Sequence, residues 1–428
     1  MTLFNRKQAS SVQVISRSIE LSEQSMYVEV PFEMPEQVED ITVEMKVESF
    51  GEGPTVIDLG IRDQDQLRGW SGGARTSFRI GIEKATPGYL SGELKAGDWA
   101  IVHNAYKVPS GGCTVSLTIT YYYKTFRWLT GDLHTHTIHS DGSYTLEEAA
   151  RIMEAVGCDF IAMTDHNTYS QNLAYPRNQE LLMIPGTELT TNFGHSNLLG
   201  AVKPMDDFRV KTSEDVQQKH LIARERGAKI VLNHPHCNYC PWEWGFDVDY
   251  DWVEVWNGPW TAANHATVNW WQEELIQGKR TVAVGGSDTH RPDPYRKHGM
   301  PCNWVWTNEK SKDGVFDGIA KGRNMITYKP DGPVVSMQCG PYMMGDAVPR
   351  GHTDRQVVLS FDQLQEKDQI VLWTEAGEAQ KWIVEQDGCH THIFDAQHCR
   401  FVRVEVWRYI AEVDLTIMAM LTNPMFFE

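Results

Sequence analysis

Residues 128–142 read WLTGDLHTHTIHSDG, a stretch that carries His134, His136, His139 and Asp141 within eight residues. His134 and His136 are two residues apart, so both imidazoles point to the same side if this segment is a β-strand. A strand can in this way offer two nitrogen ligands to one metal ion. Taken alone, the stretch also fits a polar, His-rich surface loop, because the HxH pattern often arises by chance. The segments that follow favour the strand.

Downstream of this stretch a unit recurs in which a helix is followed by a glycine, a short apolar strand and a group of polar residues. The pattern predicts helices at 145–156, 213–226 and 264–277, and strands at 160–163, 181–184, 229–232, 252–256 and 281–284. A capping box formed by Thr145 and Glu148 begins the first helix. Strands that alternate with helices predict a parallel sheet.

Histidines and carboxylates follow the carboxyl ends of these predicted strands. Polar groups gathered in this way are typical of the active face of a closed α/β barrel. An open doubly wound sheet is the alternative, but no glycine-rich phosphate-binding motif follows a first strand, which disfavours a dinucleotide-binding domain. We therefore predict a TIM-like α/β barrel at residues 126–335, closed by a helix near 312–321.

The segments on either side of the predicted barrel have β patterns. Apolar and polar side chains alternate along 41–47 and 115–121, with Gly- and Pro-containing turns between such runs. Residues 1–125 are therefore predicted to form an N-terminal β-sandwich domain, in which no cluster of titratable groups suggests chemistry. Residues 336–428 contain four further β-rich runs and are predicted to form a C-terminal β-rich domain built as a small sandwich.

Length and composition limit the class of protein. With 428 residues, the chain is too long for one ordinary domain. Its net charge of −18 argues against duplex nucleic acid as a partner, because phosphate contacts need a basic face. No long apolar run predicts a membrane span, and the first 18 residues lack the apolar core of a secretory signal. We therefore expect a cytoplasmic protein with a small-molecule substrate, and the sequence leaves its oligomeric state open.

Eight cysteines are scattered along the chain and do not form a dense disulfide framework. Cys237 and Cys240 form one CxxC pair. A zinc knuckle usually needs a second pair, and Pro241 and Trp242 follow at once, so we interpret this pair as structural.

The polar residues at or just after the predicted strand ends form one chemical set together with His195, which opens the run GHSNLLG and would start a returning strand. All are histidines or carboxylates, namely His134, His136, Asp141, His166, Glu188, His195, His234, Asp288 and His290. Imidazoles with carboxylates suit zinc, manganese or iron, and the absence of thiolates from the set disfavours a structural zinc site. Nine donors are too many for one ion. Two or three divalent metal ions are therefore predicted, about 3.5–4 Å apart and bridged by a carboxylate.

At this point the chain resembles a known family. The motifs GDLHTHTxxSDG, TDHN, GTE, GHSNLLG, NHPH and GGSDTH, within residues 131–290, look like those of the polymerase and histidinol phosphatase (PHP) superfamily of metal-dependent hydrolases. The flanking regions resemble one branch, the carbaryl-hydrolase-like metallohydrolases, in the N-terminal β-domain, the FRW sequence before GDLH and the C-terminal LTNPMFFE. The resemblance implies a distorted seven-stranded α/β barrel, in agreement with the strand and helix pattern.

The resemblance also implies how the nine donors are shared among metal ions. His134, His136 and Asp288 would bind a first ion. His166 and His290 would bind a second, with Asp141 standing where the family has Asp or His. Glu188 would bridge, and with His195 and His234 it would complete a third site if three ions bind.

The expected chemistry is hydrolysis by a metal-bound hydroxide. Two cations beside one water lower its pKa towards neutrality, polarise the scissile P=O or C=O group and stabilise the developing oxyanion. Asp165 and Asp132 are the candidates for proton handling or for orienting the imidazoles. Arg291 and Arg296 follow the ligands of the last strand and could neutralise a phosphate or form an ordinary salt bridge.

Other residues are candidates for contacting the substrate. His236 follows the NHPH ligand His234. Seven of the 15 tryptophans fall between residues 242 and 271, and core packing accounts for most of them. Trp256, Asn257 and Trp260 follow a predicted barrel strand, however, and could wall a pocket that prefers an aromatic or flat leaving group.

These observations favour a multinuclear metal-dependent hydrolase that cleaves a small-molecule ester, with a phosphoester as the first choice. A carbamate or carboxylic ester is the alternative, because the same hydroxide would attack both. Exonuclease or nucleotide phosphoesterase action is a third reading. A binding module with a vestigial barrel is the alternative outside enzymes, and the complete donor set argues against it.

Overall fold

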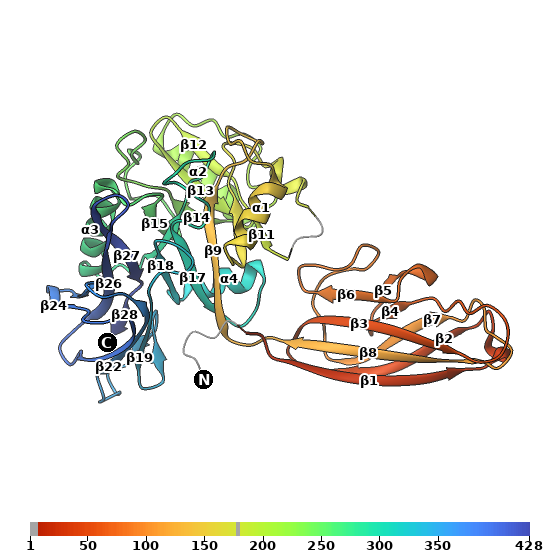
Figure 1. Ribbon diagram of the computed structural model, residues 1–428. Coiled ribbons are helices and arrows are strands. Elements are labelled where there is room, and N and C mark those ends of the chain that lie inside the picture. Colours follow the sequence, from red (N-terminus) through yellow and green to blue (C-terminus); the bar gives the residue numbers. More distant parts are fainter. Residues whose placement is uncertain (1–6, 177–179) are drawn as a thin grey trace. The chain divides into compact units, whose positions relative to one another are not determined.

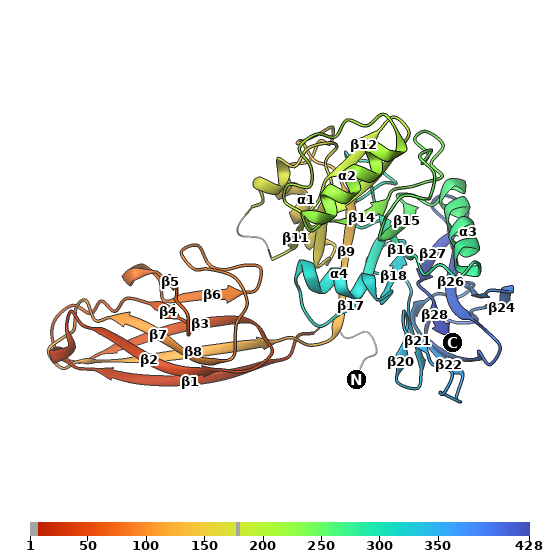
Figure 2. The ribbon, with the colours of Figure 1, turned by 180° about the vertical axis from the view of Figure 1, so that it is seen from behind.

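The computed structural model describes residues 7–176 and 180–428, and it divides them into two compact units. One, the β-unit, comprises the described residues up to Arg127 together with Asn308–Ser311. The other, the central unit, comprises the described residues of Trp128–Thr307 and Lys312–Glu428. Figures 1 and 2 show the two units from opposite sides.

The β-unit consists of two four-stranded antiparallel sheets. One sheet has the order β1 (Ser10–Ile19), β8 (Cys113–Tyr123), β3 (Val38–Ser49) and β6 (Ser77–Gly81). The other has the order β2 (Tyr27–Met34), β7 (Gly97–Asn104), β4 (Gly60–Arg62) and β5 (Leu67–Trp70). Ile41 and Leu117 of the first sheet share one buried core with Phe32 and Trp99 of the second, so the unit is a β-sandwich.

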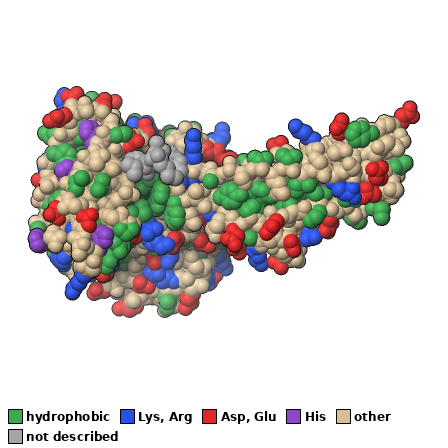
Figure 3. Space-filling model, turned by 90° about the horizontal axis from the view of Figure 1, so that it is seen from below, with side chains coloured by type: hydrophobic (Ala, Val, Ile, Leu, Met, Phe, Trp, Pro, Cys, Tyr) green, Lys and Arg blue, Asp and Glu red, His purple; other side chains and the backbone are tan. Residues whose placement is uncertain are grey.

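Hydrophobic side chains are also exposed on the surface of the β-unit, where Figure 3 draws them green. The exposed large hydrophobic side chains of β1 include Val12 and Val14, each more than half exposed. Single exposed apolar side chains are ordinary on protein surfaces, so these two residues carry no functional argument.

The central unit contains three sheets. The five-stranded sheet has the order β12 (Glu188–Thr191), β13 (Gly194–Leu199), β14 (Lys229–Leu232), β15 (Trp252–Asn257) and β16 (Val282–Gly286). The main path of the eleven-stranded sheet is β11 (Leu182–Pro185), β10 (Phe160–Met163), β9 (Arg127–Thr135), β17 (Cys302–Thr307), β18 (Asn324–Thr327), β27 (Leu415–Thr422), β26 (Phe401–Ile410), β23 (Gln369–Thr374) and β24 (Gly377–Ile383). β28 (Met425–Phe427) pairs with β26 and with β21 (Ala347–Val348).

Four α-helices alternate with these strands, which makes the central unit a mixed α/β structure. They are α1 (Leu146–Ala155), α2 (Ser213–Glu225), α3 (Ala262–Ile276) and α4 (Lys312–Ala320). Each packs against a strand, in the order β10, β14, β15 and β17 (Figures 1 and 2). The capping box expected at Thr145 and Glu148 is confirmed, and a second one begins α2 at Thr212.

The two larger sheets do not close into one barrel, so the TIM-like barrel expected from the sequence is not confirmed. Where β16 meets the other sheet, side-chain amides replace a main-chain ladder. The N–H groups of Ala283 and Gly285 donate to the amide oxygens of Asn423 and Asn303, both at 2.9 Å. The Nδ2 groups of Asn423 and Asn324 donate to the carbonyl of Ala283. Main-chain groups are thereby satisfied without continuous strand pairing.

The sequence predicts a small sandwich for the C-terminal strands, and in the structure some of these strands share a sheet with strands that carry the candidate site. β18 pairs with β27, which continues the eleven-stranded sheet into this region. A further four-stranded sheet, β20 (Tyr342–Met343), β19 (Val334–Cys339), β22 (Gln356–Leu364) and β25 (Gly388–Asp395), shares a core with it. The apolar alternation that marks these strands is the same on both sheets, so it does not reveal which strands pair.

None of the helices within residues 7–176 and 180–428 has the length and apolar character needed to span a lipid bilayer.

Candidate metal centre

Most of the candidate ligands lie at or just beyond the carboxyl ends of strands, whereas Glu188 begins β12 and His195 lies near the start of β13. His134 is on β9, and the carboxyl ends of β10, β14 and β16 lead to His166, His234 and Asp288. His234 and Asp288 have positive φ angles, 31° and 53°. Residues other than glycine rarely adopt this conformation, and it persists only where the surroundings enforce it. The fold therefore holds the main chain of these ligands in a defined, costly geometry.

A first group of donors consists of His134, His136 and Asp288, whose ligand atoms all lie within 4.8 Å of one another. The Asp288 Oδ1 atom is 3.4 Å from His134 Nε2 and 3.1 Å from His136 Nε2. Both imidazoles are almost completely buried. Burial opposes ionisation of Asp288, but the two imidazoles hold the pKa of this carboxyl well below its usual range.

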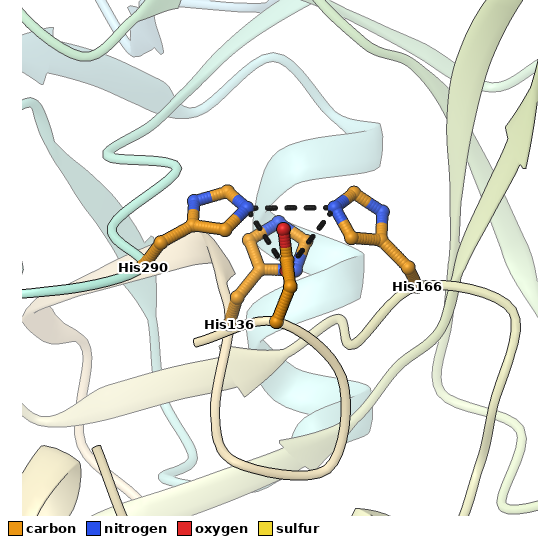
Figure 4. A group of neighbouring side chains, drawn as sticks. His136, His166 and His290 are labelled. Atoms are coloured by element: carbon orange, nitrogen blue, oxygen red, sulfur yellow. Dashed lines mark hydrogen bonds and ion pairs between the residues drawn. The ribbon is translucent and has the colours of Figure 1, made fainter. Parts of the chain in front are cut away.

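A second group consists of His136, Asp141, His166 and His290. The rings of His136, His166 and His290 approach one another from three separate segments of the chain (Figure 4). The Nε2 atoms of His166 and His290 are 3.4 Å apart, and Asp141 Oδ1 lies 3.5 and 3.4 Å from them. His290 Nδ1 donates to the carbonyl oxygen of Asp288 at 2.9 Å, which leaves Nε2 as the atom with a free lone pair.

Glu188 lies between these groups, at the start of β12 and completely buried. Its Oε1 atom is 3.4 Å from His134 Nε2 and 3.2 Å from His195 Nδ1, and its Oε2 atom is 2.7 Å from His166 Nδ1. Burial opposes ionisation, yet the imidazoles of His134 and His195 hold the pKa of the carboxyl well below its usual range. A buried carboxylate that faces several imidazoles suits a bridge between cations.

The third group, His195, His234 and Cys240, differs from the one that the resemblance implies. The rings of His195 and His234 face Glu188 Oε1, as expected, at 3.2 and 3.7 Å. The structure adds the sulfur of Cys240, 3.7 Å from His234 Nδ1. The interpretation of the CxxC pair as purely structural did not anticipate this contact. The signal lay in the position of the pair directly after NHPH.

These donors fit divalent cations. Among the described residues, the Nε2 atoms of His134 and His136 are buried and have no hydrogen-bond partner. A buried polar atom left unpaired costs free energy, so a native structure needs a reason to keep it. Imidazole nitrogens with carboxylate oxygens are the ligands that zinc, manganese and iron prefer. The residues present could therefore hold the metal ions that the motifs imply.

Several residues that the sequence did not single out position the ligands. Glu254, buried on β15, accepts a hydrogen bond from His134 Nδ1 at 2.9 Å and another from the N–H of His234 at 3.0 Å. Because a carboxylate accepts this hydrogen, His134 Nε2 is left free to bind a cation. Thr190 Oγ1 lies 2.5 Å from His166 Nδ1, and Asn233 Nδ2 donates to Glu188 Oε1.

Asp132 and Asp165, the predicted catalytic carboxylates, contact main chain and hydroxyl groups. Asp132 is completely buried and accepts hydrogen bonds from the N–H groups of His134, Ser287 and Gly299. Burial raises its pKa to about 6, despite these hydrogen bonds. Asp165 accepts from the N–H and hydroxyl of Thr137 and from the hydroxyl of Ser140. These contacts favour a structural role, and catalysis by either group stays a prediction.

The two arginines that follow the last ligand strand differ in position. Arg291 is exposed and donates only a long hydrogen bond, 3.4 Å, to the carbonyl oxygen of Asp141. Arg296 is half-buried, and its Nη1 atom lies 3.3 Å from Asp288 Oδ2 and 3.1 Å from Asn257 Oδ1. Arg296 therefore contacts the carboxylate of a candidate ligand, whereas Arg291 contacts only the main chain of one.

A cavity of about 800 Å³ adjoins Arg296 and includes two of the predicted substrate-binding residues, Trp256 and Trp260. Tyr328 and side chains of the segment 410–417, which comprises the end of β26, the following turn and the start of β27, complete much of its wall. Asn257 lies beside the cavity through its hydrogen bond with Arg296.

His236, also predicted to contact substrate, is placed differently. Its ring lies against Phe246 and Trp270, and Nδ1 is 3.2 Å from Thr267 Oγ1.

Comparisons with known proteins give distant likenesses only. No family model matches the chain, and no curated protein matches it. Among solved structures, it is similar to a two-domain protein from Bacteroides vulgatus described as containing a predicted PHP-like metal-dependent phosphoesterase. The identity is 17%, the TM-score is 0.39, and 69% of this chain and 95% of that chain are covered. An amidohydrolase from Chromobacterium violaceum is 15% identical, with a TM-score of 0.30 over 39% of this chain and 90% of that one. The side chains of the centre are therefore the features that indicate what the chain does.

Proposed function

We propose that this chain is a multinuclear metal-dependent hydrolase that cleaves an ester bond of a small molecule. The observation that carries the proposal is the meeting of three donor groups around the buried carboxylate of Glu188. The motifs that resemble the PHP superfamily support the same conclusion, and we propose a distant place for the chain in that superfamily.

Each part of the donor set has a distinct role in this proposal. His134, His136 and Asp288 hold one cation, and His166, His290 and Asp141 hold a second beside it. Glu188 faces both, and His195 and His234 extend the set to a third position. Zinc, manganese or iron at these positions would supply Lewis acidity, which acidifies a water molecule and polarises the scissile group.

Arg296 and the adjoining cavity indicate which kind of substrate the site would bind. The guanidinium lines the cavity and reaches Asp288, so it can bind an anionic group close to the metal ligands. Trp256, Trp260 and Tyr328 offer aromatic walls for a flat or apolar group. A phosphomonoester or phosphodiester with an aromatic or similarly flat substituent satisfies both features and is our first choice.

Hydrolysis of an aryl carbamate or carboxylic ester is the second candidate. The aromatic walls of the cavity favour it, because they would bind the aryl group whether or not the scissile group is charged. The two candidates differ in the charge of the substrate. A phosphate is anionic and needs the positive guanidinium of Arg296 beside it, whereas a carbamate or carboxylic ester is neutral and does not.

The test uses one aryl group in three substrates: a phosphate, a carbamate and a carboxylic ester. Wild-type protein loaded with manganese, zinc or iron should hydrolyse the phosphate fastest, and Asp288→Ala should abolish hydrolysis. Arg296→Met should raise KM for the phosphate about tenfold or more, in keeping with the loss of a charge-assisted hydrogen bond, and change the carbamate little. Unchanged hydrolysis in Asp288→Ala would contradict the site, and a carbamate preferred throughout would establish the second candidate.

A further inference from the structure

The chain turns back on itself immediately after His234 and brings two sulfur atoms to the centre. The N–H of Cys237 donates to the carbonyl of His234 at 2.8 Å, and the N–H of Trp242 donates to that of Pro235 at 2.9 Å. Within this turn, Cys240 Sγ lies 3.7 Å from His234 Nδ1 and 3.3 Å from Cys237 Sγ. The position of Cys240 is therefore fixed by the same segment that fixes His234.

His195 approaches the same place from β13. Its ring lies edge-on to that of His234, with the centroids 5.2 Å apart. Donor atoms of His195, His234 and Cys240 all lie within 4.8 Å of one another, a spacing that one ion could span. Glu188 Oε1 faces Nε2 of His234 at 3.7 Å, so the carboxylate lies at the other nitrogen of this ring from the thiol. Two imidazoles and a thiol, without the carboxylate, thus converge from two segments of the chain.

We propose that Cys240 is a thiolate ligand of a cation held by His195 and His234, so that the third position of the centre is a mixed nitrogen and sulfur site. This inference rests on the proposed function, which places a cation beside these two histidines. It goes further in assigning a cysteine that neither the motifs nor the resemblance includes, and in distinguishing this position from the other two.

A sulfur ligand changes which ion the position prefers. Thiolates favour zinc and other borderline or soft ions, whereas carboxylates and water suit manganese and magnesium. The first and second groups offer only imidazoles and carboxylates. We therefore expect the third position to select zinc or cobalt(II) over manganese more strongly than the other two do.

Binding of a cation at this position would exchange the thiol proton of Cys240 for the cation. The S–H bond of Cys240 breaks, a bond from sulfur to the cation forms, and the proton leaves to solvent. No oxidant or reductant is needed, because the sulfur keeps its oxidation state. A divalent charge is sufficient to deprotonate a coordinating thiol.

Cobalt(II) is the probe for this proposal, because a thiolate bound to cobalt(II) gives a charge-transfer absorption band in the near ultraviolet. Full-length protein is reduced, freed of metal by a chelator, titrated with cobalt(II) without oxygen, and desalted. Bound cobalt is counted by plasma mass spectrometry. We expect the band in wild-type protein, its loss in Cys240→Ser, and its retention in Cys237→Ser and in the exposed control Cys389→Ser.

The outcomes separate the two proposals. Two or more bound cobalt ions without the band would overturn the cysteine ligand and leave the multinuclear centre standing. A band that persists in Cys240→Ser, or that disappears only in Cys237→Ser, would overturn the assignment of Cys240. Failure to bind any cobalt would overturn the centre itself and this inference with it. If Cys240→Ser does not fold, the wild-type spectrum still decides whether a thiolate binds.

Discussion

Histidines are buried both in the candidate centre and on the inner face of helix α2, but their ring nitrogens differ in whether they have hydrogen-bond partners. His220 on α2 has a partner for each nitrogen: Ser196 Oγ lies 2.9 Å from Nε2 and the carbonyl of Asp249 lies 3.1 Å from Nδ1. In the centre, the buried Nε2 atoms of His134 and His136 have no hydrogen-bond partner among the described residues. The difference teaches that burial alone does not mark a ligand. An unpartnered nitrogen does not suffice either, because the buried His103 and His298 also have one. A buried histidine is a candidate ligand when such a nitrogen faces carboxylates and other imidazoles, as His134 and His136 do.

The largest expected effect comes from breaking the centre at Glu188. Glu188→Gln keeps the shape of the side chain but removes the charge that faces His134 and His195. We expect kcat/KM to fall about a thousandfold or more, equivalent to about 4 kcal/mol, because cation binding and charge stabilisation fail together. Bound metal, measured by plasma mass spectrometry, should fall as well. The exposed Glu273→Gln on α3 is the control, and full activity in Glu188→Gln would refute the bridging role.

A smaller effect is expected from Glu254, which orients a ligand without facing a cation. Glu254→Gln weakens the hydrogen bond that keeps His134 Nε2 free. Loss of such a partner typically lowers metal affinity about 10- to 100-fold. Competition with a chromogenic chelator measures the affinity, with the exposed Glu378→Gln as control. Equal affinity in wild type and Glu254→Gln would show that His134 needs no such orientation.

His220 should affect stability and leave the centre intact. Burial lowers its folded-state pKa to about 4, whereas an unfolded histidine has a pKa of about 6.5. The unfolded chain therefore binds more protons between these values. The stability that His220 contributes is fully present above pH ~6.5 and is lost as the pH falls towards ~4, with a difference of about 3 kcal/mol.

Urea unfolding of chelator-treated protein near pH 7 and near pH 5 measures this loss, without a contribution from bound metal. His220→Gln should be less stable near neutral pH and should lose less stability on acidification than wild type. Its metal content, measured separately on untreated protein, should be unchanged. A change in the metal content of His220→Gln would contradict the distinction between buried histidines that bind metal and buried histidines that only stabilise the fold.

The smallest effect is expected at the start of α1, which follows the loop that carries Asp141. Thr145 accepts a hydrogen bond from the N–H of Glu148 at 3.1 Å. Thr145→Ala should cost about 1 kcal/mol of stability, the usual value for an N-cap. Activity per folded molecule should not change, while Thr145→Ser should retain most of the stability. A large loss of activity in Thr145→Ala would mean that α1 positions Asp141.

The features of the fold and of the candidate site that can be predicted from the sequence are those determined by residues close together in the chain. The capping box at Thr145 and the strand before His166 depend on neighbouring residues, and the structure contains both. Ligands at strand ends are predictable for the same reason, because parallel strands gather their carboxyl ends at one edge.

The rest depends on residues that lie far apart in the sequence. Glu254 lies within an apolar strand, and nothing local shows that it faces His134. Cys240 carries no second CxxC pair to identify it as a ligand. The side chains of Asn303 and Asn423 form hydrogen bonds with the main chain at the edge of β16. The periodicity of the sequence does not reveal these contacts with a distant strand.

Asn423 has a consequence for the order in which the parts of the fold can be completed. Its side chain both accepts from and donates to the main chain of Ala283, which lies 140 residues earlier on the strand that leads to Asp288. During synthesis, the ribosome releases Ala283 long before Asn423. Until Asn423 has been synthesised, the edge of β16 that leads to Asp288 lacks these two hydrogen bonds, so the main chain of this ligand strand is completed late.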